Sequence, residues 1–349
     1  MRLAISLLCT LTLIFAQDIT DPVTFRESVN VVIAPTTVTK KDGSYATNLK
    51  PHQFKLYDNN QEQDIRVDMA FQPISLVVAI QCDGSMIDVL PKLKGLGSIL
   101  EAQVLGERGQ ASVIAFDHRL RVVQEWTSDS KPINEAVMKL KPGSSSHRMV
   151  DAVTEAARML NKRPTDSRRV VLLIGETQDK ASEGRVREAL TALQFANVSY
   201  YALNVNRLIK ALNAKAPAPR PDPIPSTARH GPNGSALDPT SIAQYTGVNN
   251  GSVIPVFVEI FKQVKAIFID NPTEVFSRYT GGREYSFISQ GALERAVLDI
   301  GEELHTQYLL SYNPNNKLEG GFHEIRVTTD QLDLHVRTRP GYWMAGKPD

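Results

Sequence analysis

The stretch Ile74-Ser-Leu-Val-Val-Ala-Ile-Gln-Cys-Asp-Gly-Ser-Met86 decides the fold of this chain. Its first part is an apolar run of strand length, and its second part is a small polar loop that contains a glycine. An apolar run bounded by turn residues is typical of a strand that is covered on both faces of a sheet. In open α/β sheets, ligands bind just beyond the carboxyl ends of such strands. The stretch therefore predicts a central strand followed by a candidate binding loop, Gln81 to Ser85.

The residues that follow this stretch alternate between strand patterns and helix patterns. Three further strands are predicted at Ser112–Phe116, Val170–Ile174 and Val198–Val205. Apolar residues at helical spacing predict helices over Met149–Leu160 and Val186–Leu193. This alternation indicates a mostly parallel sheet with helices on both faces. We expect the α/β unit to occupy residues 73–305, with a proline-rich insertion at about residues 207–255.

The second half of the α/β unit contains the insertion and three more helix patterns. Prolines alternate with small or polar residues from Pro217 to Pro225, so we expect an extended surface loop there. The apolar residues of Phe257–Phe268 lie at helical spacing. Asn271-Pro272 predicts a helix start, with Asn at the N-cap and Pro at the first helical position. A last helix over Leu293–Leu304 leads into a strand at Gln307–Tyr312.

Both ends of the chain, residues 17–72 and 306–349, are rich in strand patterns. Four alternating segments predict two hairpins: Phe54–Tyr57 with Ile65–Met69, and Phe322–Thr328 with Leu332–Thr338. Such short strands form no sizeable core alone. We therefore expect the two ends to pair into one small β-sandwich, from which the α/β unit protrudes.

The first sixteen residues predict a secretory signal peptide. Arg2 supplies a positive start, Leu3–Phe15 is almost entirely apolar, and Ala16 is a small residue at a cleavage point. The apolar run is shorter than the roughly 20 residues of a membrane span, although an uncleaved anchor is the alternative. We expect a mature chain that is secreted or periplasmic, and that is not an integral membrane protein after cleavage.

Charge and cysteine content limit the function further. The net charge of +1 gives no reason to expect nucleic acid or an anionic membrane as partner. Cys82 would be the only cysteine of the mature chain, so the fold has to rest on its core without an internal disulfide. As a small residue that tolerates apolar surroundings, Cys82 is expected to serve packing rather than reactivity.

The common enzyme motifs are missing from the sequence. There is no G-x-S-x-G elbow around Ser85 and no His-Glu-x-x-His pattern. The pair Gly281-Gly282 lacks the spacing of a phosphate-binding loop, and the histidines show no metal-ligand spacing. We therefore expect a protein that is not an enzyme.

Three blocks of sequence, in order, resemble a known family. They are Val38-Thr-Lys-Lys-Asp-Gly43 with Phe54-Lys-Leu-Tyr-Asp58; the strand and loop up to Ser85-Met86; and Tyr279-Thr-Gly-Gly-Arg283, Gln307-Tyr-Leu-Leu-Ser-Tyr-Asn-Pro314 and Arg337-Thr-Arg-Pro-Gly-Tyr342. From about residue 25 to Trp343, the chain resembles the VWFA-related (acidobacterial-type) von Willebrand factor type A domain proteins of bacteria. The resemblance implies a Rossmann-like von Willebrand A fold with a metal-ion-dependent adhesion site. In such sites, oxygen ligands hold Mg²⁺ and an acidic group of a partner protein binds it.

The residues of this chain depart from the family's Asp-x-Ser-x-Ser motif. Gln81 stands in the place of the Asp, Asp83 replaces the first Ser, and Ser85 matches the second. His147 falls at the position of the family's loop threonine, although Ser144, Ser145 or Ser146 could supply a hydroxyl if the loop slips, and Glu176 replaces a second Asp. The resemblance thus implies a degenerate site with Gln81, Asp83, Ser85, His147 and Glu176 as partner-binding residues. It implies Asp83, Ser85 and Glu176 as ligands of a divalent cation, Mg²⁺ or Mn²⁺.

Simpler interpretations exist for individual residues. Asp83-Gly84 fits ordinary turn chemistry, His147 a solvated loop histidine, and Glu176 the cap of a following helix. Convergence of all three loops on one sheet edge favours a shared site.

Three functions are compatible with these patterns. The leading hypothesis is an exported, non-enzymatic protein-interaction module of the adhesion type, which binds another secreted or envelope protein through this sheet edge. The alternative is a metal-independent structural envelope protein that uses its β-sandwich for contacts. A hydrolase that depends on Ser85 is the third hypothesis.

Overall fold

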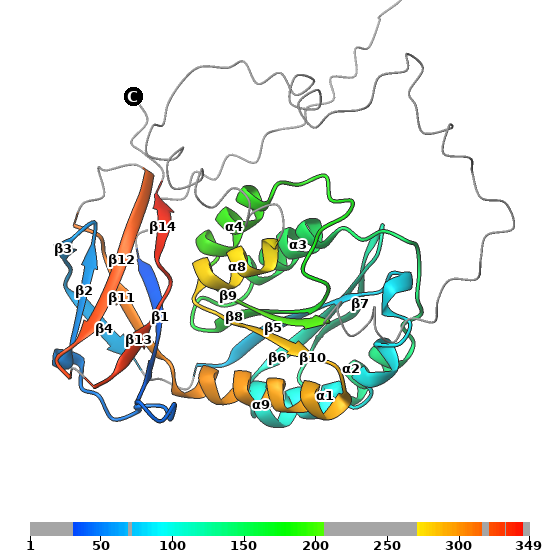
Figure 1. Cartoon of the computed structure of the whole chain (residues 1–349), viewed down its shortest axis with the longest axis horizontal. Helices are drawn as coiled ribbons and strands as arrows, with labels where there is room; N and C mark the ends of the chain where they lie inside the picture. The colour runs from blue at the N-terminus through cyan, green and yellow to red at the C-terminus, as the bar shows by residue number, and fades with distance from the viewer. Residues whose placement is uncertain (1–30, 69–71, 206–270, 316–320, 332, 345–349) are drawn as a thin grey trace, which may run out of the picture.

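The computed structural model describes residues 31–68, 72–205, 271–315, 321–331 and 333–344. A helix-covered sheet stands beside a smaller part made only of strands (Figure 1). Within the described ranges, no helix is long and apolar enough to cross a membrane. The predicted signal peptide, the proline-rich insertion and the helix pattern Phe257–Phe268 lie outside the described residues.

The larger part is built on a six-stranded sheet in the order β10-β9-β8-β5-β6-β7. Its strands are β5 (Ile74–Gln81), β6 (Gln110–Phe116), β7 (Leu120–Thr127), β8 (Arg168–Gly175), β9 (Val198–Val205) and β10 (Glu284–Phe287). All pairings are parallel except the one between β6 and the edge strand β7. The predicted central strand, β5, lies between β6 and β8, and all eight of its residues are buried.

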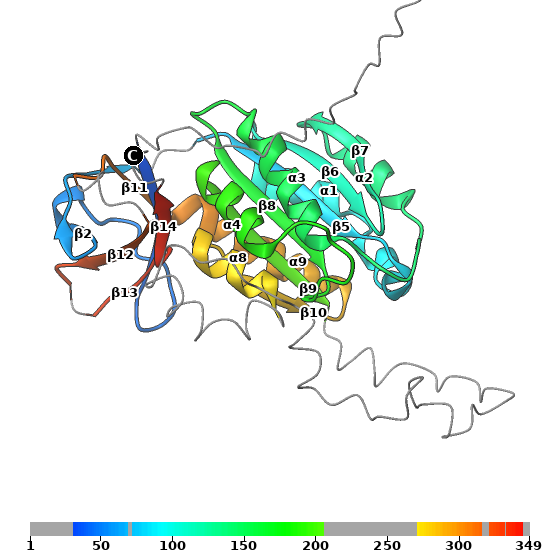
Figure 2. The same cartoon turned by 90° about the horizontal axis from the view of Figure 1, so that it is seen from above.

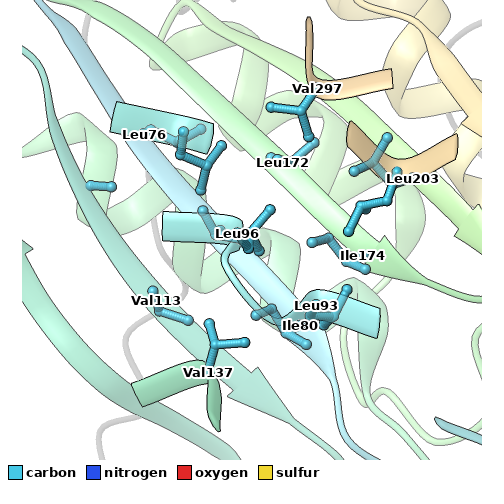
Figure 3. Packing of buried hydrophobic residues seen from close by; sticks show 14 of the residues in the cluster. Leu76, Ile80, Leu93, Leu96, Val113, Val137, Leu172, Ile174, Leu203 and Val297 are labelled. Carbon is cyan, nitrogen blue, oxygen red and sulfur yellow. The ribbon is translucent and has the colours of Figure 1, made fainter. Parts of the chain in front are cut away.

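Side chains of β5 alternate between two apolar cores, one on each face of the sheet. Leu76 and Ile80 pack on the face that is covered by α1 (Leu96–Leu100), α2 (Ser130–Met138) and α9 (Gln290–Thr306) (Figure 3). Val77 and Ala79 pack on the opposite face, under α3 (Met149–Asn161), α4 (Val186–Phe195) and α8 (Pro272–Thr280) (Figure 2). Because helices cover both faces of the sheet, the side chains of the continuous apolar run of β5 are buried on either side. Short helical turns complete this part at η2 (Gly84–Met86), η3 (Leu90–Leu93) and η4 (Glu101–Leu105).

The smaller part is a β-sandwich of two four-stranded sheets, in the orders β13-β1-β11-β4 and β14-β12-β2-β3. The strands are β1 (Val32–Thr39), β2 (Phe54–Asp58), β3 (Gln61–Glu62), β4 (Ile65–Asp68), β11 (Tyr308–Tyr312), β12 (Gly321–Thr329), β13 (His335–Arg337) and β14 (Gly341–Met344), with the turn η1 at Pro51–Gln53. Buried side chains from both sheets form one apolar core. The predicted fold class is confirmed, because strands from the two ends of the chain pair in both sheets.

Both predicted hairpins were wrong in their pairing. In the first, β2 turns at Asn59 and Asn60, which have φ angles of 47° and 64°, and pairs with the two-residue β3. The next strand, β4, crosses to the facing sheet and pairs with β11. In the second, β12 pairs with β14, while β13 pairs with β1. Each strand is placed by burial against the shared core, since a local hairpin alone buries too little surface.

A buried carboxylate joins the sandwich to the larger part. Glu303 on α9 is fully buried; it accepts a hydrogen bond of 2.7 Å from the Tyr201 hydroxyl on β9 and pairs with Arg337 on β13. The Arg337 guanidinium also donates to the carbonyls of Gly281 and Gly282, at 2.9 and 2.7 Å. These contacts fix β13 against the helix that leads into β11.

Candidate functional site

Three loops meet at the carboxyl ends of β5, β6 and β8. The loop after β5 is bound to its neighbours through the backbone: the Gly143 N–H donates to the Cys82 carbonyl at 2.6 Å, and the Gly84 N–H donates to the Ser144 carbonyl at 2.8 Å. On the side of β6, the Cys82 N–H donates to the Phe116 carbonyl at 2.8 Å. The loops that the sequence analysis singled out are therefore neighbours in space.

Asp83 is the centre of this site. Its side chain is fully buried and caps η2, where its Oδ1 accepts from the Ser85 N–H at 3.0 Å and from the Ser85 hydroxyl at 2.5 Å. The same oxygen accepts from Gln81 Nε2 at 3.0 Å, and Oδ2 lies 2.8 Å from His147 Nδ1. Burial raises the pKa of Asp83, but the hydrogen bonds from His147, Ser85 and Gln81 outweigh it and hold the pKa well below its ordinary value.

The Gln81 amide fixes the loop against β8. Its Oε1 accepts from the backbone N–H of Glu176 at 2.7 Å, so its Nε2 faces Asp83 and the Ser85 hydroxyl, the latter at 3.2 Å. A Cβ on Gly175 would lie 2.6 Å from Gln81 Oε1, which explains why this amide needs a glycine beside it. Gln81 thus links the ends of β5 and β8. Its amide is neutral, so it supplies no negative charge to balance a cation.

His147 is held by contacts of both ring nitrogens. Nε2 lies 2.7 Å from the Gln178 carbonyl, which only accepts, and Nδ1 lies 2.8 Å from the Asp83 carboxylate. Gln81 Nε2 is also near Nδ1, at 3.1 Å, but its two hydrogens are taken by Asp83 and Ser85. These contacts hold the buried ring in one orientation between the Asp83 carboxylate and the Gln178 carbonyl.

Glu176 comes directly after β8 and is paired with a lysine. Its side chain is nearly buried, and its Oε2 lies 3.3 Å from Nζ of Lys180, four residues later. The same ammonium lies 4.0 Å from Asp83 Oδ2. The sequence analysis did not single out Lys180. The spacing of Glu176 and Lys180 was the available signal, but the second contact depends on how the loop folds back.

Two other residues near the site have local structural roles. Asp179 Oδ1 accepts from the backbone N–H groups of Met149 and Val150, at 2.7 and 3.1 Å, and so caps α3. The Ser144 hydroxyl donates to the Ser146 carbonyl at 2.9 Å. Asp179 thus caps the preceding helix, whereas α4, the helix that follows Glu176, begins after Arg185 without a side-chain cap.

Most of the predicted site residues lie below the surface. Gln81, Asp83 and His147 have no exposed area, and Ser85 is half-buried. Beside this polar cluster lies a groove of about 330 Å³, lined by Ile87, Leu90, Pro91, Lys94, Val137, Met138, Leu140 and Pro142. Ile87 is 61% exposed and Met138 67% exposed. The sequence analysis missed this groove, because its lining comes from separate segments, including η3 and α2, whose packing no periodic signal encodes.

Comparison with known proteins agrees with this architecture. A family model described as von Willebrand factor type A domain matches residues 93–178. The chain contains a von Willebrand factor type A (VWA) domain. These domains form a family of protein-interaction modules, and they often bind a divalent metal. No curated protein matches the chain significantly.

Three solved structures are among those similar to this VWA protein. A conserved hypothetical protein, BatB, from Bacteroides thetaiotaomicron is 16% identical, with a TM-score of 0.39, and the match covers 66% of this chain and 98% of that one. An aerotolerance-related membrane protein from Bacteroides fragilis is 17% identical, with a TM-score of 0.38, covering 66% and 99%. The vWF domain of the type V pili tip protein Mfa5 from Porphyromonas gingivalis is 15% identical, with a TM-score of 0.28, covering 32% and 40%.

The residues present in this VWA domain do not fit a divalent cation in the arrangement described. Both Asp83 oxygens already accept hydrogen bonds, and the Ser85 hydroxyl donates to one of them. Asp83 is in contact with His147, and Glu176 is paired with the Lys180 ammonium. Among the described residues, no three His, Cys, Asp or Glu side chains are grouped as a metal would require.

Proposed function

We propose that this chain is an exported, non-enzymatic protein-interaction module of the adhesion type. Its partner is another secreted or envelope protein, which docks at the carboxyl-end edge of the central sheet. The observation that carries the proposal is the exposed apolar groove beside the polar cluster. Scattered exposed apolar side chains are normal, but a groove that gathers them is typical of an interaction site.

The groove gathers Ile87 and Met138, the two most exposed large apolar side chains in the part of the chain that the structure describes. Its volume suits one or two apolar side chains of a partner. Lys94 is the one charged residue among those that line it. We therefore expect a partner segment with an apolar anchor and a carboxylate that faces Lys94.

The loops that carry the polar cluster also carry residues that line the groove. Ile87 follows Ser85 by two residues, and Pro142 adjoins Gly143, which is hydrogen-bonded to Cys82. The buried contacts of Asp83 therefore hold in place the two loop segments that carry Ile87 and Pro142. In this proposal, Gln81, Asp83, His147 and Glu176 act mainly by positioning, while the half-buried Ser85 meets the partner.

The proposed export of the protein rests on residues 1–16. Their positive start, apolar run and small residue at position 16 support cleavage after Ala16, into the periplasm or the medium. N-terminal sequencing of the mature protein should read from Gln17.

The cluster lacks the pairing that an enzyme of the hydrolase type needs. The Ser85 hydroxyl donates to Asp83, and both nitrogens of His147 are held by Asp83 and the Gln178 carbonyl. A nucleophilic serine requires a neighbouring base that accepts its proton. We therefore propose recognition without turnover.

A competing form of this proposal keeps the metal. In it, an Mg²⁺ or Mn²⁺ ion held by Asp83, Ser85 and Glu176 takes part in docking. Partner binding is then lost in EDTA and restored by added metal.

Site-specific photocrosslinking tests the proposed surface. A photoreactive amino acid is placed at Met138, and in a matched variant at Leu298 on α9, which is 42% exposed and is not among the residues that line the groove. We expect a discrete crosslinked protein from envelope extract or culture medium with the first variant only. Equal crosslinking at both positions would show that the groove is not the docking site.

Affinity measurements on the crosslinked protein complete the test. The double change Ile87→Asp and Met138→Asp should weaken binding by at least about tenfold, which corresponds to about 1.4 kcal/mol. Leu298→Asp is the matched control and should bind like the wild type. Unchanged binding by the groove variant would move the contact to another surface, such as the β-sandwich.

A further inference from the structure

We infer that the Lys180 ammonium is the resident cation of this strand edge, in place of the divalent metal that VWA domains often hold there. The inference concerns this chain's own residues, and it can be tested on the isolated protein without any partner. It is therefore independent of the proposed docking surface.

The position of Lys180 is the first observation. Its Nζ lies 3.3 Å from Glu176 Oε2 and 4.0 Å from Asp83 Oδ2, so one ammonium pairs with both carboxylates of the predicted ligand set. Asp83 is fully buried and Glu176 nearly so, whereas the Lys180 side chain is 39% exposed. The lysine thus closes the site from the solvent side.

The charges of the site are the second observation. Asp83 and Glu176 supply two carboxylates, and the Lys180 ammonium lies within 4.0 Å of an oxygen of each, while His147 Nδ1 also contacts Asp83 Oδ2 at 2.8 Å. A divalent ion added here would face an ammonium at close range. Neighbouring charged groups have other partners: Asp117 lies 3.9 Å from Arg121, Arg148 pairs with Asp151 and Glu183, and Asp179 caps α3.

The loop that carries Lys180 is held in place, which is the third observation. The Lys180 N–H donates to the His147 carbonyl at 3.4 Å. The preceding residue, Asp179, accepts from the first turn of α3 and from the Ser182 hydroxyl. The ammonium is therefore presented at the site by an anchored backbone.

The inference predicts that this site binds its partner without added metal. The exposed side of the ammonium is open to an anion, and so a partner's carboxylate would meet a lysine instead of a metal ion. This last consequence alone rests on the proposed function, and its measurement is partner affinity in EDTA.

Three variants test the role of Lys180 directly. Lys180→Met removes the charge and keeps the stem, and Lys180→Arg keeps the charge. Lys139→Met is the matched control, since Lys139 also pairs with a glutamate four residues away, Glu135, at 3.7 Å. For each protein, Mn²⁺ binding is measured by electron paramagnetic resonance, and the unfolding temperature is measured in EDTA and in millimolar Mn²⁺.

We expect no Mn²⁺ binding and no shift of the unfolding temperature with metal for the wild type, Lys180→Arg and Lys139→Met. We expect Lys180→Met to unfold about 2–5 °C lower in EDTA, because two buried carboxylates lose a counter-charge, and Mn²⁺ to restore part of that loss. Wild-type protein that binds Mn²⁺ would overturn the inference. So would a Lys180→Met variant that behaves like the wild type in both measurements.

Discussion

Two buried Asp–His pairs of similar geometry lie in the two parts of this molecule. In the sandwich, Asp58 Oδ1 lies 2.7 Å from His323 Nδ1, and in the VWA domain Asp83 Oδ2 lies 2.8 Å from His147 Nδ1. All four side chains are buried. The pairs differ in what surrounds them, and that difference separates a structural pair from one that supports a surface.

Aromatic hydroxyls complete the sandwich pair. Asp58 Oδ2 accepts from the hydroxyls of Tyr312 and Tyr342, each at 2.8 Å, and both tyrosines belong to the apolar core. Burial and the neighbouring charges raise the pKa of both tyrosines far above its ordinary value, so they stay neutral donors. With its two tyrosines, this pair joins four strands, β2, β11, β12 and β14, and none of these residues lines the groove described above.

Loop residues complete the VWA pair. The hydrogen-bond partners of Asp83 come from the end of β5 and from the loop before α3, and Lys180, in the loop after β8, connects the pair to solvent. The same chemistry thus holds a core in one part and holds surface loops in the other. Placement at the carboxyl ends of parallel strands is what distinguishes the second pair.

The largest expected effect is that of Asp58→Ala. It leaves a histidine and two tyrosine hydroxyls buried without their acceptor, and should lower the free energy of unfolding by about 3–5 kcal/mol. Denaturant unfolding measures it. Lys41→Ala is the matched control, because it removes an exposed ion pair with Asp333 in the same sandwich and should leave the midpoint unchanged. A loss below about 1 kcal/mol for Asp58→Ala would contradict a structural role.

Asp83→Ala should lower the free energy of unfolding by a smaller amount, about 2–3 kcal/mol, because water can enter the loops and solvate His147 and Gln81. The same change should also weaken binding of the crosslinked partner, which Asp58→Ala should leave intact wherever the protein stays folded. Equal effects of the two changes on partner binding would break the distinction between the pairs.

The pH dependence of stability should separate Asp83 from its neutral isostere. The folded-state pKa of Asp83 is depressed, so its contribution to stability is fully present above the unfolded-state pKa of about 3.9 and is lost as the pH falls below that value toward the folded pKa. The difference in unfolding free energy between wild type and Asp83→Asn should therefore shrink below about pH 4. A constant difference across that range would show that the carboxylate charge is not stabilised by its partners.

The smallest expected signal is thiol labelling of Cys82, which lies between Gln81 and Asp83. Burial raises the pKa of this thiol to about 12, so it should not react with a disulfide reagent near pH 8 in the folded protein. In a Cys9→Ser variant, the Cys82 thiol should react completely after the protein is unfolded in denaturant. Fast labelling of the folded protein would reveal an open strand edge, in conflict with the hydrogen-bonded loop described here.

The sequence predicted the larger part of this fold well. The apolar run Ile74–Gln81 and the helical spacing of Met149–Leu160 are strong local signals, and both elements formed as predicted. The edge strand β7 was not predicted, because its half-exposed residues lack a regular alternation. The hairpins were mispaired because strand partners in a sandwich are chosen by a core that forms between distant segments.

The candidate site was predictable only in part. Strand ends gave Gln81, Asp83 and Glu176, since parallel strands bring their carboxyl ends together. The contact of Lys180 with Asp83 depends on the path of the loop after β8, which no local pattern encodes. The groove at Ile87 and Met138 depends on how η3 and α2 pack together, and it also requires the tertiary structure.

The most direct test of this account is a crystal structure of the protein grown in millimolar Mn²⁺, with an anomalous difference map at the manganese edge. We predict no anomalous peak between Asp83, Ser85 and Glu176, and electron density that places the Lys180 ammonium against the two carboxylates. An anomalous peak at that position, with Lys180 turned away, would contradict the central claim that the chain supplies its own cation.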